Sequence, residues 1–354
     1  MLLIVQWPQV AAAQQGGLTC TPDFEPATPG FDFIRREHAA LAADDQARIG
    51  HVYYSRLPIF DESDPEEDNF LFRWANDFHL LTREETISRQ LLFAEGTPYE
   101  PRLLAESGRL LRSQSYFADA AIRPISRCGD DIAVEVITKD NWSLTPTIAF
   151  DRFGGENTFA VGIRDSNLLG RGKLLDIGYG DDLDQRTSEL QYKDNNVFGT
   201  RIRNSTTIVD SDEGEVLAFD TDLPFFSLDS RRSWAVRMKN EQRHDEQYFR
   251  GEEVSEVIHQ LEDYTLEMGF SRGLRGKIAN RWRVGLRYER NDFLPSPDLP
   301  APALFPADRK LVYPYISYES VEDDFTTAVN FEQIYRTEDL QLGHQWSLAL
   351  GYAT

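Results

Sequence analysis

The stretch Trp282-Arg283-Val284-Gly285-Leu286-Arg287-Tyr288-Glu289 alternates strictly between apolar and polar residues. A β-strand places successive side chains on opposite faces of its sheet, so this stretch predicts a strand with one apolar and one polar face. Aromatic residues stand at both ends of its apolar face. Four further stretches alternate in the same way: 159–164, 264–271, 325–331 and 346–352.

A soluble β-sandwich also alternates, so the kind of residue on each face decides between the two folds. The apolar faces carry aromatic residues at or near the strand ends, which is typical of the aromatic girdles of membrane barrels. The other faces mix Gly, Ser, Arg and Glu, as expected for a water-filled lumen. The pattern favours an antiparallel transmembrane β-barrel over a sandwich, with about eleven or twelve candidate strands.

Composition excludes two other classes. The 354 residues carry a net charge of −22, which excludes nucleic acid as a partner because phosphate binding depends on Lys and Arg. The mean hydropathy is −0.47, and no apolar run reaches about 18 residues, which excludes a bundle of transmembrane helices. The chain is longer than a typical domain, and its pattern changes near Asp140 from leucine-rich, helix-like segments to short strand-like ones.

The N-terminal segment predicts export. Residues 1–14 have an apolar core and a small-residue cleavage-like site, and we interpret them as a signal peptide. An apolar terminus without targeting function stays open as the alternative, because the basic segment of a signal peptide is missing. Residues 15–50 predict a leader or linker. Cys20 and Cys128 are the two cysteines of the sequence, and whether they pair is left open.

Residues 51–140 predict an α+β domain with the order strand, helix, helix, strand, strand. The acidic run 61–68 predicts a solvated loop after the first strand. Thr82 and Glu85 form a capping-box pattern at the start of the first helix, and Pro101 stands in the first turn of the second. The expected strands are 51–60, 116–125 and 132–138, and the expected helices are 83–93 and 100–112.

Four segments of this domain, read together, carry a resemblance to a known family. They are Leu91–Tyr99 (LLFAEGTPY), Leu103–Arg112 (LLAESGRLLR), Tyr116–Ala120 (YFADA) and Val134–Trp142 (VEVITKDNW). The block closely resembles the POTRA domain that adjoins the barrel in BamA-type outer-membrane assembly factors. Asn167–Lys173 (NLLGRGK) looks like the first periplasmic hairpin turn of the bacterial surface antigen barrel in the same superfamily.

The resemblance covers about residues 51–200 and implies a two-part chain. Residues 51–140 would form a POTRA-like domain of βααββ order in the periplasm, and residues 141–354 an outer-membrane β-barrel. Family members carry more barrel strands than this sequence offers, and the chain ends without the terminal aromatic residue common in barrel proteins. We therefore expect a sequence that is incomplete at its C-terminus.

The predicted periplasmic turn has a physical basis of its own. Gly170 and Gly172 allow positive φ in a tight connection between the alternating segments 158–164 and 173–180. Together with Asn167 they form the predicted hairpin turn. If the α+β domain is periplasmic, this turn is on the periplasmic side, and 153–157 and 181–184 are external.

The resemblance implies a factor for outer-membrane protein assembly or translocation. Its mechanism would be physical: a POTRA strand edge pairs with an extended client by β-augmentation, and the barrel templates or conducts the client. The implied partners are outer-membrane lipids, unfolded outer-membrane or secreted clients, and accessory lipoproteins. The client-binding edge is expected at Ile132, Val134, Val136 and Thr138, or along 116–124.

Two other functions stay open as alternatives, a passive outer-membrane channel or receptor and a secretion pore for a single client. Arg164, Arg283 and Arg287 would then be lumen charges. An enzyme is not expected, because the sequence has no Gly-x-Ser-x-Gly motif and its six histidines lack metal-site spacing. No cofactor and no metal site are predicted.

Overall fold

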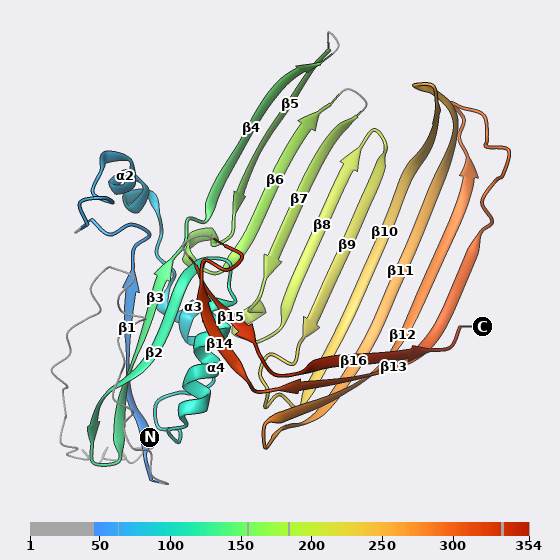
Figure 1. The fold of residues 1–354 in the computed structure, drawn as a ribbon. Helices are drawn as coiled ribbons and strands as arrows, with labels where there is room; N and C mark the ends of the chain where they lie inside the picture. Colours follow the sequence, from blue (N-terminus) through green and yellow to red (C-terminus); the bar gives the residue numbers. More distant parts are fainter. Residues whose placement is uncertain (1–45, 63, 154–155, 183–184, 334–335, 354) are drawn as a thin grey trace, which may run out of the picture.

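The computed structural model describes residues 46–62, 64–153, 156–182, 185–333 and 336–353. The predicted signal peptide (1–14), most of the predicted leader (15–50) and Cys20 lie outside the described residues. Within them, the chain forms an N-terminal α/β unit followed by a large antiparallel sheet (Figure 1).

The α/β unit is a three-stranded sheet packed against helices. Its elements are β1 (Arg48–Leu57), α2 (Phe70–Phe78), α3 (Glu84–Ser88), α4 (Pro101–Arg112), β2 (Phe117–Cys128) and β3 (Asp131–Asp140). The strand order is β1-β3-β2, with β3 parallel to β1 and antiparallel to β2. β3 is therefore the central strand and is paired along both of its edges.

The core of the unit lies between this sheet and the helices. Val134 and Val136 of β3 are at most 1% exposed and belong to one buried cluster with Leu104 and Leu111 of α4. The two leucines are seven residues apart and so share one face of the helix. Ile87 of α3 joins the same cluster, and burial of each such side chain contributes about 1.5–3 kcal/mol.

The helices differ from the prediction in two respects. α2 was not predicted; Asn69 caps it by accepting a hydrogen bond from the Phe72 amide at 3.1 Å. α3 ends at Ser88 instead of continuing to residue 93, because the Leu92 amide donates to Ser107 Oγ at 2.9 Å rather than back along the helix.

The predicted capping box is also wrong. The Thr82 hydroxyl donates to the Asp140 carboxylate at 2.9 Å, and α3 begins only at Glu84. The acidic run after β1 forms turns and bends as far as it is described, in agreement with the predicted loop.

The large sheet is an antiparallel meander of eleven strands. It contains β4 (Leu144–Phe153), β5 (Glu156–Asp165), β6 (Lys173–Asp181), β7 (Arg186–Asp194), β8 (Arg203–Ser211), β9 (Gly214–Leu223), β10 (Arg232–Phe249), β11 (Glu252–Arg275), β12 (Ile278–Pro295), β13 (Arg309–Glu322) and β16 (Gln345–Gly351). Short 3-10 helices lie between β5 and β6 (Leu168–Gly170) and between β7 and β8 (Val197–Gly199). The sheet is curved but not closed, and β4 and β16 are its edges (Figure 1).

One predicted barrel strand belongs to a different element. The stretch 325–331 contributes β14 (Phe325–Val329), which pairs with β15 (Thr337–Gln341) in a separate hairpin. β16 pairs directly with β13, so this hairpin projects from the connection between two strands of the large sheet. In Figure 1 the hairpin lies beside α4 and β2 of the α/β unit.

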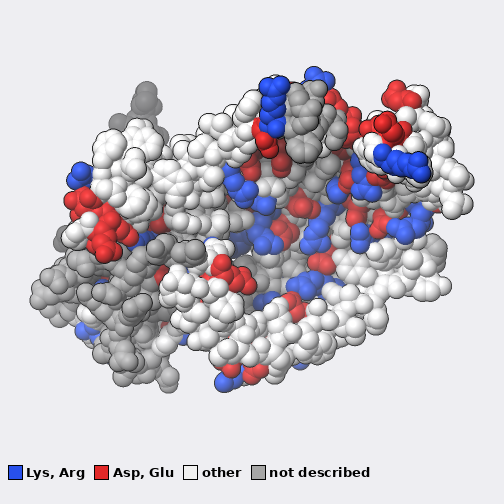
Figure 2. All heavy atoms as spheres, turned by 45° about the horizontal axis from the view of Figure 1, so that its top comes forward, with Lys and Arg blue, Asp and Glu red and all other residues white. Residues whose placement is uncertain are grey.

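Because apolar and polar residues alternate along the strands, the large sheet has one apolar face and one polar face. Leu190, Ile208 and Leu217 are cross-strand neighbours in β7 to β9, as are Leu266 and Leu286 in β11 and β12. These five side chains are between 37% and 56% exposed, although they are apolar. Charged residues gather inside the hollow of the curved sheet, whereas its outer surface is largely uncharged (Figure 2).

Two further observations complete the fold. Cys128, at the end of β2, is disulfide-bonded. Among the described helices, none is both long enough and apolar enough to cross a membrane.

Candidate functional site

One end of the large sheet is bonded to the α/β unit through a series of connections. Four connections of the sheet make polar contacts with the unit: 166–172, 195–202, 224–231 and 323–344. Their partners are helices α3 and α4, the segments next to these helices and the start of β2. These contacts hold the unit at that end of the sheet.

The first connection contains the predicted hairpin turn. Asn167 is 2% exposed. Its side-chain oxygen accepts from the Gly172 amide at 2.7 Å, and its amide nitrogen donates to the Thr82 hydroxyl at 2.8 Å. Thr82 in turn donates to Asp140 at 2.9 Å, and the same carboxylate oxygen lies 2.9 Å from His79 Nε2. One buried hydrogen-bond chain thus joins the turn to the end of β3.

Both predicted glycines are required by this contact. Gly170 and Gly172 have φ angles of 70° and 63°, as the sequence predicts. A Cβ at Gly170 would lie 2.6 Å from the Leu81 carbonyl oxygen, and a Cβ at Gly172 would lie 2.7 Å from the Tyr116 hydroxyl. The turn therefore approaches the α/β unit so closely that only glycine fits at these two positions.

The second connection repeats the first, which the sequence analysis missed. Asp165-Ser-Asn-Leu-Leu-Gly170 recurs as Asp194-Asn-Asn-Val-Phe-Gly199. In each copy the aspartate accepts from the backbone amide two residues on at 2.9 Å, and the fifth residue, Leu169 or Phe198, has a positive φ. The pattern Asp-x-Asn followed by two apolar residues and Gly was the available signal.

The second turn is also bonded to the α/β unit. Gln90 donates to the Asn196 side chain at 2.7 Å. Arg201 donates to the Leu91 carbonyl at 2.7 Å and stacks over the Phe226 ring at 4.7 Å. Burial lowers the pKa of Arg201. Arg201 is thus part of this contact.

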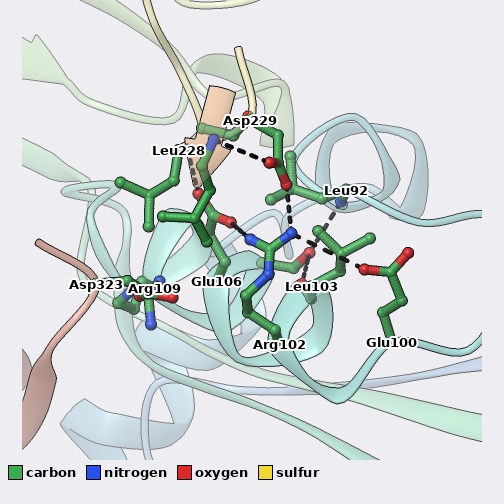
Figure 3. Close-up of polar contacts among 12 residues, drawn as sticks. Leu92, Glu100, Arg102, Leu103, Glu106, Arg109, Leu228, Asp229 and Asp323 are labelled. Atoms are coloured by element: carbon green, nitrogen blue, oxygen red, sulfur yellow. Dashed lines mark hydrogen bonds and ion pairs between the residues drawn. The ribbon is translucent and has the colours of Figure 1, made fainter. Parts of the chain in front are cut away.

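Three arginines on one face of α4 bind the connections 224–231 and 323–344, and the sequence analysis did not identify them. Arg102 pairs with Asp229 in the 224–231 connection and with Glu106 on its own helix (Figure 3). Glu106 accepts from the Leu228 amide at 2.6 Å, and burial raises the pKa of Glu106. The other two arginine pairs are Arg109 with Asp323 at 3.2 Å and Arg112 with Asp339 at 2.6 Å.

The β14–β15 hairpin is fixed against α4 and β2 by buried polar groups. Thr337 donates to Asp119, which is fully buried in β2. Burial raises the pKa of Asp119 to about 6. Arg336 donates to the backbone carbonyls of Arg112 and Gln114 at 2.6 and 3.0 Å. The hairpin is thus held at the end of α4 and at the start of β2.

The predicted client-binding edge is wrong for β3. β1 pairs with one side of β3 and β2 pairs with the other, so β3 offers no open edge to a client. The residues concerned are Ile132, Val134, Val136 and Thr138. The second expected edge, 116–124, falls largely on β2, which is an outer strand of this sheet.

The predicted lumen charges lie on the concave face, each beside a carboxylate. Arg164 is 3.2 Å from Asp176. The other two pairs are Arg283 with Glu319 at 2.8 Å and Arg287 with Asp263 at 2.6 Å. Arg287 and Asp263 also line a hollow of about 540 Å³ on this face. The concave face is therefore polar but locally charge-balanced.

Aromatic residues form two rows on the convex face. In one row, the Trp282 and Tyr318 rings are 4.6 Å apart, and Tyr318 and Trp346 are 5.0 Å apart. In the other row, Tyr264 and Tyr288 stack at 5.6 Å. Trp282 and Tyr288 are six residues apart on β12, which corresponds to roughly 20 Å of strand. Exposed aliphatic side chains fill the interval between the rows.

Comparisons with known proteins give matches among solved structures. No family model matches the chain, and no curated protein matches it. The chain is similar to BamA from Haemophilus ducreyi lacking POTRA domains 1–3, with 11% identity, a TM-score of 0.36, and coverage of 86% of this chain and 85% of that one.

The chain is also similar to CdiB from Acinetobacter baumannii, with 9% identity and a TM-score of 0.39. That match covers 87% of this chain but spans only 46% of the CdiB chain. Both TM-scores lie below 0.5.

Proposed function

We propose that this chain is part of a bacterial outer-membrane factor for β-barrel assembly or protein translocation, with the α/β unit as a POTRA-like domain in the periplasm. The observation that carries the proposal is the curved sheet with an exposed apolar convex face and a charged concave face. This is the arrangement that a strand-built wall between lipid and water requires.

The convex face fits contact with lipid. Its side chains remain exposed in rows, and aromatic residues bound the aliphatic interval as interfacial girdles do. A soluble protein would not expose so much contiguous apolar surface without a partner. The partner proposed here is the hydrocarbon of the outer membrane.

The α/β unit would hold the large sheet at the periplasmic ends of its strands. Two repeated turns and the β14–β15 hairpin are bonded to it, so its orientation relative to the strands is fixed by many contacts. A unit held at the periplasmic ends of the strands can present a client to the sheet without a covalent step. We accordingly propose a non-enzymatic role.

The client would be captured by strand addition. Among the described strands, β4 is bonded to β5 alone, and its other side is an edge of the large sheet. An edge strand presents backbone amides and carbonyls to an extended segment. We propose that unfolded outer-membrane or secreted proteins pair there or at the outer strand β2, with accessory lipoproteins as further partners.

A specific observation also favours a second function, a passive channel or a pore for one secreted client. The concave face carries Arg164, Arg283 and Arg287, each next to a carboxylate, and such pairs suit a water-filled conduit. Because the pairs neutralise one another locally, we expect weak ion selectivity from such a channel.

Depletion of the protein in its own bacterium separates these functions. An assembly factor predicts that many different outer-membrane proteins decrease in the membrane fraction while their messenger levels stay constant. A dedicated secretion pore predicts the loss of a single exported client. An unchanged outer-membrane proteome with altered solute uptake would refute the assembly role and support the channel.

A further inference from the structure

α2 carries an exposed apolar stripe that the contacts described so far do not use. Its members are Phe70 (73% exposed), Leu71 (66%), Trp74 (48%) and Phe78 (68%), followed by Leu80 (57%). Leu71, Trp74 and Phe78 follow the spacing of one helix face. The Trp74 and Phe78 rings lie 4.7 Å apart. With aromatic side chains of about 150–250 Å² each, the stripe exceeds the few hundred Å² that mark an interaction surface.

The opposite side of α2 is fixed to the protein, so the stripe points outward. Ala75 is buried, and Phe72 stacks on Phe60 at 4.0 Å. The Asn76 side chain donates to the Phe60 carbonyl at 3.0 Å and accepts from the Phe60 amide at 3.1 Å. The end of the helix is held as well, because His79 is 2.9 Å from Asp140.

The stripe continues into the apolar surface at the base of the large sheet. The Leu80 carbonyl adjoins Gly170 in the first repeated turn, where Leu169 is 52% exposed. Phe198, its counterpart in the second turn, is fully exposed. Figure 1 shows α2 outside the sheet, at the height of the lower part of β4 and β5.

The charges around α2 indicate which surface it fits. The stripe itself contains no charged residue, and the preceding segment 61–68 contains six carboxylates. Arg73 is paired with one of them, Asp68, at 2.9 Å. Anionic headgroups would be repelled by this segment, whereas a zwitterionic headgroup region accepts Trp and Phe side chains without a charge penalty.

We propose that α2 lies in the periplasmic leaflet of the outer membrane, with its stripe in zwitterionic lipid and its acidic flank in water. The inference rests on the proposed membrane location of the sheet. α2 then acts as a lateral anchor that fixes the rotation of the α/β unit about the strands. Helices that bind in this way need an apolar face and a polar face rather than a membrane-spanning length.

The test places one nitroxide label at a time on the full chain, reconstituted in phosphatidylcholine and phosphatidylethanolamine vesicles without reductant. The variants are Leu71→Cys in the stripe, Glu66→Cys in the exposed acidic segment that precedes α2 and Val284→Cys on the convex face. The unsubstituted chain is the control for labelling of the native cysteines. Collisions with oxygen report lipid, and collisions with a water-soluble nickel chelate report water.

We expect a high oxygen-to-nickel ratio at Leu71→Cys and Val284→Cys and a low ratio at Glu66→Cys. We also expect that enrichment of the vesicles in phosphatidylglycerol lowers the ratio at Leu71→Cys but not at Val284→Cys. A nickel-accessible Leu71→Cys beside a lipid-exposed Val284→Cys would overturn the anchor and leave the proposed function standing.

The remaining outcomes are equally decisive. If Leu71→Cys is accessible to neither reagent, another segment or a second copy covers the stripe, and the lipid contact is refuted. If Val284→Cys is also exposed to nickel in folded protein, the membrane location itself fails. A ratio at Leu71→Cys that rises with phosphatidylglycerol would refute the preference for zwitterionic lipid.

Discussion

The contact between α4 and the β14–β15 hairpin can be measured with a double-mutant cycle at Arg112 and Asp339. The guanidinium donates two hydrogen bonds to the carboxylate, at 2.8 and 2.6 Å, and the two side chains are only 12% and 15% exposed. The cycle compares Arg112→Gln, Asp339→Asn and the double variant, so that effects of each residue on other contacts cancel.

The expected magnitude follows from this geometry. Hydrogen bonds to charged groups contribute about 1.5–3 kcal/mol each, and desolvation of the two ions offsets part of that sum. Each single substitution leaves a poorly hydrated charge without its partner, so we expect a cost of about 2–4 kcal/mol for each and a coupling free energy of about 2 kcal/mol.

Amide hydrogen exchange in residues 325–341 is the direct assay, because it reports the free energy of opening the hairpin without unfolding the sheet. The matched control is the pair Arg102 and Asp229, measured by exchange in residues 224–231; these two side chains are 31% and 46% exposed. Solvent screening limits the coupling of that pair to about 0–1 kcal/mol. Equal coupling in the two pairs, or additive effects at Arg112 and Asp339, would refute the role assigned to burial here.

Three other predictions address the turn, the buried acid and the two faces of the sheet. Gly172→Ala should lower the stability of the contact between the turn and the α/β unit by about 2–4 kcal/mol. Positive φ alone costs about 1–2 kcal/mol, and the new Cβ would meet Tyr116. The control Gly178→Ala has open space around it and should change the free energy of urea unfolding by less than about 0.5 kcal/mol. Burial raises the pKa of Asp119 from 3.8 to about 6, so the folded state binds the proton more tightly and hairpin stability should fall as pH rises from about 4 to 7, by up to about 3 kcal/mol. Asp119→Asn should abolish that slope in exchange measurements at the two pH values, and an unchanged slope would show that another group titrates. Leu190→Arg on the convex face should lower the free energy of unfolding in lipid vesicles by about 2–4 kcal/mol, whereas the adjacent Gln191→Arg on the concave face should be tolerated. Equal effects of the two substitutions in a gel-shift folding assay would contradict the lipid-facing assignment.

The sequence was most informative where structure depends on local pattern. The alternation from Trp282 to Glu289 suffices to define β12 and its two faces, because a strand's faces are set by neighbouring residues. Gly170 and Gly172 were identified for a similar reason, since positive φ is a local demand. The alternation at Phe325, however, could not reveal that β14 pairs with β15 outside the large sheet.

The rest depends on contacts between distant segments. Nothing in the run from Ile132 to Thr138 shows that β1 adds parallel to β3 and closes its second edge. In α4 the leucines were visible as an apolar face, but the partners of Arg102 and Arg112 are 127 and 227 residues away. Pairs at such separations leave no periodic signal in a single sequence.

The separation of Arg112 from Asp339 also has a consequence for the order of folding. Neighbouring strands from β4 to β13 are joined by connections much shorter than 227 residues, so they can pair progressively with little loop-closure entropy. The hairpin can reach α4 only after its own strands have been synthesised and β13 is in place. Docking of β14–β15 is therefore a late, high-contact-order step, and the ion pair at Arg112 should affect the unfolding rate more than the folding rate.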